Sequence, residues 1–255
     1  MAEKTYNIPQ ELIERLRAAK RIAVLTGAGV SAESGIPTFR DAQTGLWAKY
    51  NPEDLATPEA FARNPRLVWD WYSERRARVT QAEPNPGHLA LAVLERCVPT
   101  VTIITQNVDG FHQRAGSSRV IELHGNIRRV KCSIEGNIVE VWEETDTPPP
   151  LCPRCHGLLR PDVVWFGELL PEQALKEATE ATAACDVFFS IGTSGQVYPA
   201  ASLINFARSC GATVVVINPD EEVQASPSFY RLHGPAGKVL PELLEAVWPE
   251  AGSLR

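Results

Sequence analysis

The sequence lacks any long apolar segment and any surplus of positive charge. Its longest clean apolar runs, such as Val214 to Ile217, have the length of a β-strand, whereas a membrane-spanning helix needs about 18 or more apolar residues in a row. Acidic residues outnumber basic ones, 31 against 25, and the net charge is −6. Proteins that bind phosphate backbones usually carry a basic surplus, so we expect neither nucleic acid nor a membrane as a partner.

The amino-terminal segment also lacks the apolar core and the cleavage pattern of a secretory signal. In a chain that is not exported, six cysteines indicate free thiols or a metal site rather than a framework of disulfides. We therefore expect a cytoplasmic protein. The sequence does not define an oligomeric state, and a monomer is compatible with it.

Short apolar runs alternate with helical patterns along most of the chain. The runs have the length of buried strands and lie at residues 22–26, 101–105, 187–191 and 213–217. Helical patterns lie at residues 9–20, 171–184 and 199–209, with a closing helix at 241–247. This alternation predicts an α/β fold with a Rossmann-like parallel sheet and helices on both faces.

Two regions interrupt this rhythm and are interpreted as insertions that build a smaller module. Residues 37–85 read as helix and loop with three tryptophans, and residues 126–165 carry three cysteines and a run of three prolines. The first would be a helical insertion and the second a zinc-ribbon-like insertion. We predict one catalytic unit over residues 1–255, with the Rossmann-like core at about 9–36, 86–125 and 166–250.

A glycine-rich loop follows the first predicted strand. Residues 27–32, GAGVSA, fit the pattern G-x-G-x-x-G/A, in which glycines let the backbone approach a pyrophosphate and the next helix offers free N–H groups. The same pattern also fits a tight strand-to-helix turn that binds no ligand. A second strand ending in an acidic residue about 20 positions later is missing, so we do not expect a standard dehydrogenase unit.

Six motifs occur in an order that resembles the sirtuins, the NAD-dependent protein-lysine deacylases. They read GAGVSAESGIPTFR, TQNVDGFH, ELHG, VVWFGE, GTS and VVINPD, and the resemblance spans roughly residues 22–245. The resemblance implies that NAD is bound, and consumed, by these motifs and by the loop after the first of them. The implied cofactor-binding residues are Gly27, Ala28, Gly29, Ser31, Phe39, Arg40, Trp47, Gln106, Asn107, Val108, Asp109, Gly192, Thr193, Ser194, Asn218, Pro219, Asp220 and Ala236.

The resemblance also implies that His124 and Asn107 are catalytic. Nicotinamide would leave the ribose, His124 would take a proton from a ribose hydroxyl, and the products would be free lysine, nicotinamide and an O-acyl-ADP-ribose. A histidine titrates near neutral pH and therefore suits a general base. Without the resemblance, His124 would read as a hydrogen-bonded structural residue and the segment 106–109 as a polar turn.

The substrates implied by the resemblance are proteins that carry an acylated lysine. The strip formed by Val164, Trp165 and Phe166 would pair with the substrate backbone as an added strand.

The acyl group is suggested by a tyrosine and an arginine three residues apart. Tyr72 and Arg75 share one face of a predicted helix, and a phenol beside a guanidinium can bind a carboxylate. The pair resembles that of the sirtuins that remove malonyl and succinyl groups, and the small Ala56 would leave room for a longer acyl chain. We predict desuccinylase and demalonylase activity with some deacetylase activity. A surface pair on an amphipathic helix is the alternative.

Sirtuins of this type carry two C-x-x-C pairs that bind a structural zinc. Here Cys132, Cys152 and Cys155 match that spacing, but Glu135 stands where the fourth cysteine is expected. Glu135 could supply a carboxylate ligand, His156 or a water could complete the shell, or the site could be metal-free with Cys152 and Cys155 as a remnant or a disulfide. Three thiolates at this spacing favour zinc, one per chain. The other cysteines are expected to pack as small apolar groups: Cys97, Cys185 and Cys210.

Other functions remain open at this point. A protein ADP-ribosyltransferase or an NAD glycohydrolase would begin with the same loss of nicotinamide. An inactive NAD-binding regulatory module belongs to a different class, and it would be expected to lack His124 or Asn107. A zinc-dependent DNA-binding protein is disfavoured by the acidic balance and by the altered metal motif.

Overall fold

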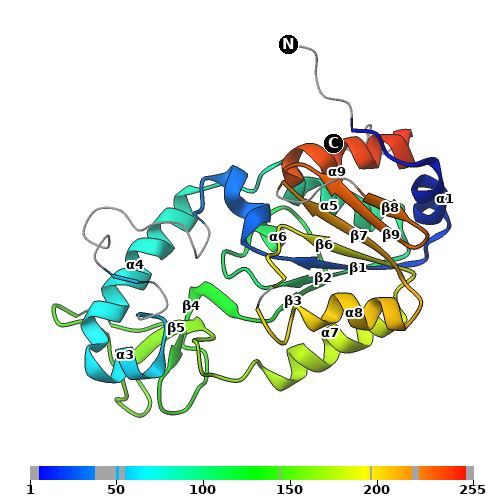
Figure 1. The fold of residues 1–255 in the computed structure, drawn as a ribbon. Helices are drawn as coiled ribbons and strands as arrows, with labels where there is room; N and C mark the ends of the chain where they lie inside the picture. The colour runs from blue at the N-terminus through cyan, green and yellow to red at the C-terminus, as the bar shows by residue number, and fades with distance from the viewer. Residues whose placement is uncertain are drawn as a thin grey trace.

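The computed structural model describes residues 6–37, 50–51, 55–143, 145–195, 197–219 and 224–250. Its main element is a seven-stranded sheet in the order β3-β2-β1-β6-β7-β9-β8, in which β8 alone runs antiparallel to its neighbour (Figure 1). The strands are β1 (Arg21–Thr26), β2 (Thr100–Thr105), β3 (Val120–Glu122), β6 (Val187–Ile191), β7 (Thr213–Asn218), β8 (Gln224–Ser226) and β9 (Phe229–His233). The predicted α/β fold with a parallel sheet is confirmed.

Helices cover the sheet on both faces, which explains why its central strands are buried at nearly every residue. Helices α1 (Gln10–Ala18), α5 (Pro86–Cys97) and α9 (Ala236–Val247) pack on one face, and α7 (Glu172–Ala184) and α8 (Ser202–Ser209) pack on the other (Figure 1). Every residue of β6 is buried, as expected for a strand with helices above and below it.

The chain order of the strands creates a switch point at the centre of the sheet. From β1 the chain moves outward to β2 and β3, then returns to place β6 on the other side of β1 and continues outward. In open α/β sheets, ligands bind beyond the carboxyl ends of the strands at such a reversal. The loops after β1, β2, β3, β6 and β7 all begin at that edge.

A smaller module projects from this edge of the sheet. It contains α3 (Pro58–Arg63), α4 (Pro65–Gln81) and the antiparallel pair β4 (Gly125–Cys132) and β5 (Leu159–Val163) (Figure 1). Its helices begin at residues whose side chains accept N-terminal N–H groups, Thr57 for α3 and Asn64 for α4. An apolar cluster that includes Trp71, Tyr72 and Trp165 joins α4 to β5 and to the segment after it.

Two short helices complete the described elements near the switch point. They are the 3₁₀ helix η1 (Ala28–Ser34) and helix α6 (Phe111–Arg114). None of the described helices is long and apolar enough to cross a membrane.

Two expectations need correction. The closing helix begins at Ala236 rather than at Pro241, so the proline lies inside α9. Pro241 lies beyond the first turn, so α9 lacks the backbone bond to the carbonyl of Gly237. Cys210 is exposed after the last turn of α8, whereas Cys185 is buried and Cys97 half-buried. The expectation that all three pack in the interior is therefore wrong for Cys210.

Candidate active site

The loops after β1 and β6 pack backbone against backbone at the switch point. The Gly27 N–H donates to the Ile191 carbonyl and the Gly29 N–H to the Gly192 carbonyl, both at 3.0 Å. A Cβ on Gly192 would lie 2.4 Å from the Val30 backbone nitrogen, and the φ of Gly192 is +59°. Glycine is therefore needed at this contact because backbone atoms leave no room for a side chain.

We expect Gly192→Ala to destabilise the fold and weaken NAD binding. The clash with rigid backbone and the left-handed φ should together cost about 2–4 kcal/mol, equivalent to a fall in Tm of about 5–15 °C. Thermal unfolding and calorimetric titration with NAD measure the two effects. Gly195→Ala is the matched control, since Gly195 has a similar φ of +66° but open space around its Cβ position. Equal losses in the two variants would contradict the packing argument.

A buried polar cluster lies beneath this contact and involves the loop after β2. The Asn107 amide donates to the Gly27 carbonyl and to the Ser31 hydroxyl, both at 3.1 Å, and Ser31 donates to Asp109 at 2.8 Å. The Asn107 N–H also donates to the Thr105 hydroxyl at 3.0 Å. Because both amide protons of Asn107 are engaged inside the protein, the group it can offer to a ligand is its carbonyl oxygen.

Two buried histidines support this cluster from behind. His112 Nε2 lies 2.9 Å from the Thr26 hydroxyl, and His88 Nδ1 accepts the Asn85 N–H at 3.3 Å. Burial lowers the pKa of His88 to about 4 and that of His112 to about 3. Both are therefore neutral at physiological pH and serve as hydrogen-bonding groups that hold the loops.

His124 lies at the end of the loop after β3, facing the same edge of the sheet. Its Nδ1 is 3.0 Å from the Gln106 carbonyl oxygen, and a carbonyl can only accept, so Nδ1 carries the proton. The other ring nitrogen, Nε2, then has a free lone pair. Burial lowers the pKa of His124 and the bond to Gln106 offsets part of that shift, so the neutral imidazole able to accept a proton is favoured.

The remaining predicted cofactor residues are those with hydrogen bonds in the structure, those that lie at the sheet edge, and those outside the described residues. Asn218, at the end of β7, donates to the Thr193 carbonyl at 3.1 Å, and Thr193 contacts the Ser190 hydroxyl at 2.8 Å. Ala236 is buried and starts α9, whose next N–H donates to the Glu33 carboxylate at 2.6 Å. Several predicted residues lie outside the described residues: Phe39, Arg40, Trp47 and Asp220. Others lie at this edge of the sheet, at the start of η1 or on the loops, and are half-buried or exposed: Ala28, Val108, Ser194 and Pro219.

The strip 164–166 runs beside His124 and crosses toward the smaller module. The Val164 N–H donates to the His124 carbonyl at 3.0 Å, and the Phe166 N–H donates to the Ala56 carbonyl at 2.9 Å. The Trp165 N–H donates to the Glu168 carboxylate at 2.8 Å. All three N–H groups therefore have acceptors within the chain, and the Trp165 carbonyl accepts the Glu168 N–H. A peptide paired with this strip would therefore donate its N–H groups to the carbonyls of Val164 and Phe166.

Tyr72 and Arg75 lie on the face of α4 that packs toward this strip. Tyr72 is only 2% exposed, and its hydroxyl accepts the Trp165 indole N–H at 3.1 Å. Burial raises the pKa of Tyr72 far above its ordinary value, and the charge of Arg75 offsets part of this shift. The interpretation of the pair as an exposed feature of an amphipathic helix is therefore wrong for Tyr72.

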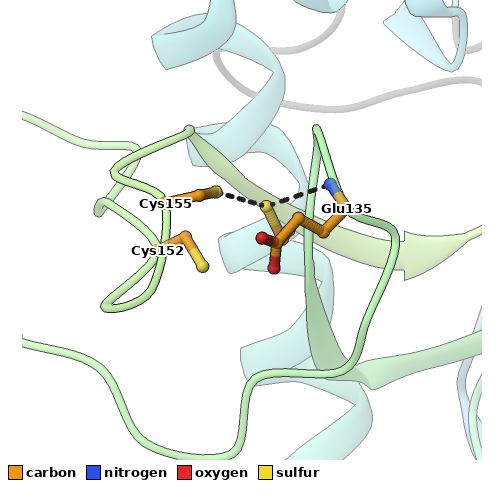
Figure 2. A group of neighbouring side chains, drawn as sticks. Glu135, Cys152 and Cys155 are labelled. Carbon is orange, nitrogen blue, oxygen red and sulfur yellow. Dashed lines mark hydrogen bonds between the residues drawn. The ribbon is translucent and has the colours of Figure 1, made fainter.

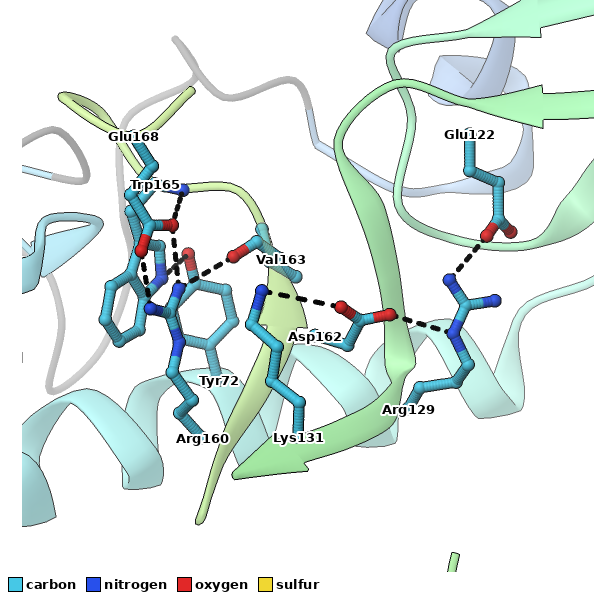
Figure 3. A network of polar contacts seen from close by, with 9 residues as sticks. All are labelled: Tyr72, Glu122, Arg129, Lys131, Arg160, Asp162, Val163, Trp165 and Glu168. Carbon is cyan, nitrogen blue, oxygen red and sulfur yellow. Dashed lines mark hydrogen bonds and ion pairs between the residues drawn. The ribbon is translucent and has the colours of Figure 1, made fainter. Parts of the chain in front are cut away.

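A chain of charged side chains connects the His124 segment to the small module. Arg129 on β4 donates to Glu122 at 2.6 Å and to Asp162 on β5 at 2.9 Å (Figure 3). Lys131 pairs with the other oxygen of Asp162 at 3.5 Å. Since Glu122 lies two residues before His124, these contacts tie the position of the histidine to the β4–β5 pair.

The altered cysteine motif forms a compact set of donors at the far end of β4. One ligand atom from each of Cys132, Glu135, Cys152 and Cys155 lies within 4.8 Å of the others (Figure 2). All six cysteines are free thiols. Burial alone would raise the pKa of Cys132, but the Glu135 and Ile134 N–H groups and the neighbouring thiols lower it. The pKa of Cys155 is raised to about 11, because the Gly157 N–H lowers it less than the adjacent Cys132 and Cys152 thiols and burial raise it.

Three sulfurs and one carboxylate oxygen at this separation fit a tetrahedral zinc ion. His156, the other protein ligand considered for the fourth position, is not part of this group, although it follows Cys155 directly. The Glu135 carboxylate also lies 3.6 Å from Arg154, which is 70% exposed, so this ion pair is weak. Glu135 therefore remains available as the fourth donor.

Sequence reasoning did not single out two residues of this region. The buried Arg160 and the half-buried Glu168 form an ion pair directly behind Trp165 (Figure 3). Glu168 is the last residue of the motif VVWFGE, so the motif itself could have pointed to this residue. Nothing in the local pattern distinguishes Arg160 from a solvated strand residue.

Comparisons with known proteins agree with this geometry. The model of the Sir2 family matches residues 27–199. An "NAD-dependent protein deacylase" of Ralstonia nicotianae is 55% identical over 229 residues, which is 90% of this chain and 93% of that protein. A solved structure of a Sir2 homologue–NAD complex has a TM-score of 0.87 and 44% identity, covering 98% of this chain and 97% of the other. A mutant Sir2 homologue with 2′-O-acetyl ADP ribose has a TM-score of 0.85 and 45% identity over 96% and 98% of the two chains.

Proposed function

Because the chain belongs to the Sir2 family and is an NAD-dependent protein deacylase, we propose that it acts on lysines that carry acidic acyl groups. Succinyl-lysine and malonyl-lysine would be its preferred substrates, and acetyl-lysine a poorer one. The products would be free lysine, nicotinamide and an O-acyl-ADP-ribose. The observation that carries the preference is the Tyr72–Arg75 pair on the inner face of α4.

The residues at the switch point suit a dinucleotide. The Gly27–Gly29 turn brings backbone close to the edge of the sheet, the Asn107 carbonyl offers an acceptor, and Asn218 and Thr193 border the loop after β6. NAD, when bound, supplies a ribose carbon that loses nicotinamide and accepts the acyl oxygen. We assign the binding of its ribose groups to the residues after β2, β6 and β7, by the geometry of the parallel sheet.

We assign the proton transfer of the reaction to His124. Its Nδ1 is held by the Gln106 carbonyl, so Nε2 is the only ring atom able to take a proton. The carbonyl of His124 receives the Val164 N–H, which fixes the base relative to the strip that we assign to the substrate peptide. This contact supports a shared site for base and peptide.

The acidic preference follows from the charges and hydrogen bonds on α4. Burial lowers the pKa of Arg75, which means that the protein interior disfavours its positive charge. An acyl carboxylate beside Arg75 would offset that cost, and the neutral Tyr72 hydroxyl would donate to the same carboxylate. Ala56, at 3% exposure and without a long side chain, borders the strip through the bond to Phe166.

The test is a panel of one peptide carrying acetyl-, succinyl- or malonyl-lysine, assayed with Arg75→Met. We expect the kcat/KM for the two acidic substrates to fall by at least about tenfold, the cost of a lost hydrogen bond to a charged group. The kcat/KM for acetyl-lysine should change by less than about threefold. Liquid chromatography of deacylated peptide measures all three.

Arg66→Met is the matched control for this panel. Arg66 lies on the same helix and pairs with Asp70 at the surface, so its loss removes one positive charge from α4 without removing a contact of Tyr72 or Arg75. Equal efficiency of the wild type on all three peptides would exclude the acidic preference. Equal losses on all three in Arg75→Met would show that Arg75 is structural. A cytoplasmic location stays a prediction.

A further inference from the structure

An ion pair between a buried arginine and a half-buried glutamate lies behind the strip 164–166 and contacts Trp165 at its centre. Arg160, on β5, has a side chain that is only 9% exposed. Its guanidinium donates to both carboxylate oxygens of Glu168, at 2.6 and 2.9 Å, and to the Val163 carbonyl at 2.9 Å (Figure 3). Such a bidentate pair fixes the planes of both groups relative to each other.

Glu168 also closes a tight turn at the end of the strip. Its N–H donates to the Trp165 carbonyl at 3.0 Å, while its carboxylate accepts the Trp165 N–H at 2.8 Å. Gly167, between them, has a φ of +86°, as in the third position of a type II turn. One carboxylate therefore holds the backbone of Trp165 and the guanidinium of Arg160 together.

The same guanidinium fixes the orientation of the Trp165 ring. The Arg160 Cζ lies 3.3 Å from the ring centroid, and the Phe61 ring packs against the indole with centroids 5.3 Å apart. With the ring held in this way, its Nε1–H donates to the Tyr72 hydroxyl at 3.1 Å. Because the Tyr72 oxygen accepts this proton, its own O–H proton must point to a different acceptor.

We propose that Arg160 and Glu168 are positioning residues for acyl-group recognition: they hold the Trp165 indole, and the indole aims the Tyr72 hydroxyl at the carboxylate of the acyl group. Neither residue touches the substrate. This inference rests on the proposed acidic preference, and it names the structural cause of that preference. An ion pair with a buried arginine contributes little to net stability, whereas here the pair contacts both the backbone and the ring of Trp165, the neighbour of Tyr72.

One variant tests this role without removing Tyr72, Arg75 or a residue of the strip. Glu168→Gln keeps the shape but loses the charge. It should lower kcat/KM for the succinyl peptide about tenfold, mainly through KM, and that for the acetyl peptide by less than about threefold. Glu11→Gln, which breaks the exposed Arg15–Glu11 pair on α1, is the control and should change neither.

A double-mutant cycle distinguishes a positioning role of Glu168 from a general loss of order in the site. If Glu168 acts through Tyr72, Glu168→Gln should cause no further selective loss in a Tyr72→Phe background. Arg160→Lys keeps the positive charge but loses the bidentate hydrogen bonds to Glu168 and the stacking on Trp165. Its effect on the two kcat/KM values should therefore resemble that of Glu168→Gln. Equal losses on succinyl and acetyl peptides, or fully additive losses with Tyr72→Phe, would overturn the proposal.

Fluorine NMR of protein labelled with 5-fluorotryptophan gives a readout that does not depend on acyl preference. The Trp165 signal, identified by its loss in Trp165→Phe, should shift in Glu168→Gln and stay in place in Glu11→Gln. An unshifted signal in Glu168→Gln would overturn the positioning role whatever the substrate preference. A wild-type enzyme that does not prefer acidic acyl groups would overturn the proposed function instead, even with a shifted Trp165 signal.

Discussion

Replacing His124 with alanine is expected to lower kcat for deacylation about 10²- to 10⁴-fold, the contribution of a positioned general base. The imidazole Nε2 is the acceptor that the geometry leaves free, since Nδ1 is committed to the Gln106 carbonyl. NAD affinity and Tm should change little, because the ring contributes one hydrogen bond and lies half-buried at the site's edge. Single-turnover assays with an acyl peptide measure the chemical step, and calorimetry measures the binding of NAD.

The pH dependence of the wild type gives an independent check on the base. Burial lowers the pKa of His124 below its ordinary value of 6.5. A protonated ring cannot accept a proton, so kcat/KM should rise with pH through the pKa of His124 and then level off. Because that pKa is lowered, the acid limb should lie below pH 6.5 and the enzyme should retain most of its activity at that pH.

The products of the His124 variant separate the competing activities. Mass spectrometry should find O-acyl-ADP-ribose and free lysine peptide with the wild type, and a parallel loss of both in His124→Ala. Retention of full deacylation in that variant would exclude His124 as the base. Accumulation of ADP-ribosylated protein by the wild type would instead favour the transferase that shares the first step.

The sequence predicts the central sheet because its strands are apolar on both faces. A run such as Val187 to Ile191 can be buried only between two layers of helices, and this is where β6 lies. The start of α9 could not be predicted from the sequence. Pro241 has the character of a helix start, and only the packing of residues 236–240 shows that the helix begins earlier. Cys210 shows the same limit, because exposure at the end of α8 depends on tertiary packing.

For the site, the motifs predict which loops meet but not what holds them. Gly27 and Gly192 are 165 positions apart in the numbering, and their contact follows once β1 and β6 are placed side by side. The Arg160–Glu168 pair cannot be predicted from the order of the strands. Its role depends on a turn at Gly167 and on the stacking of Trp165, and neither has a periodic signature.

The second large effect concerns the metal site, where Cys152→Ser is expected to lower Tm by about 10 °C or more. The apolar cluster around this site is small, and two of its buried members are the ligands Cys132 and Cys152 themselves. With so little apolar area, folding of this region must draw on the binding energy of the metal. Losing about 3–4 kcal/mol of it corresponds to the stated fall in Tm for a chain of this size.

The metal content of the wild type, measured by inductively coupled plasma mass spectrometry, should be one zinc per chain and should fall in Cys152→Ser. Removal of zinc from the wild type by a chelator should reproduce the lower Tm, and added zinc should restore it. A Cys152→Ser variant with full zinc content and an unchanged Tm would contradict a structural role for the metal.

Glu135→Cys is the matched variant that should act in the opposite direction. A fourth thiolate is a softer ligand than a carboxylate, and the weak contact with Arg154 is all that Glu135 would give up. Zinc should then be retained roughly tenfold longer against a chelating dye than in the wild type, while Glu135→Ala should release it faster. If all three proteins released zinc at the same rate, Glu135 would not be a ligand. The effect on deacylation should be smaller than that on Tm, because the metal site contacts the active site only indirectly. Trp69 packs on this cluster from α4, and β4 continues from Cys132 back to the Arg129–Asp162 pair near His124.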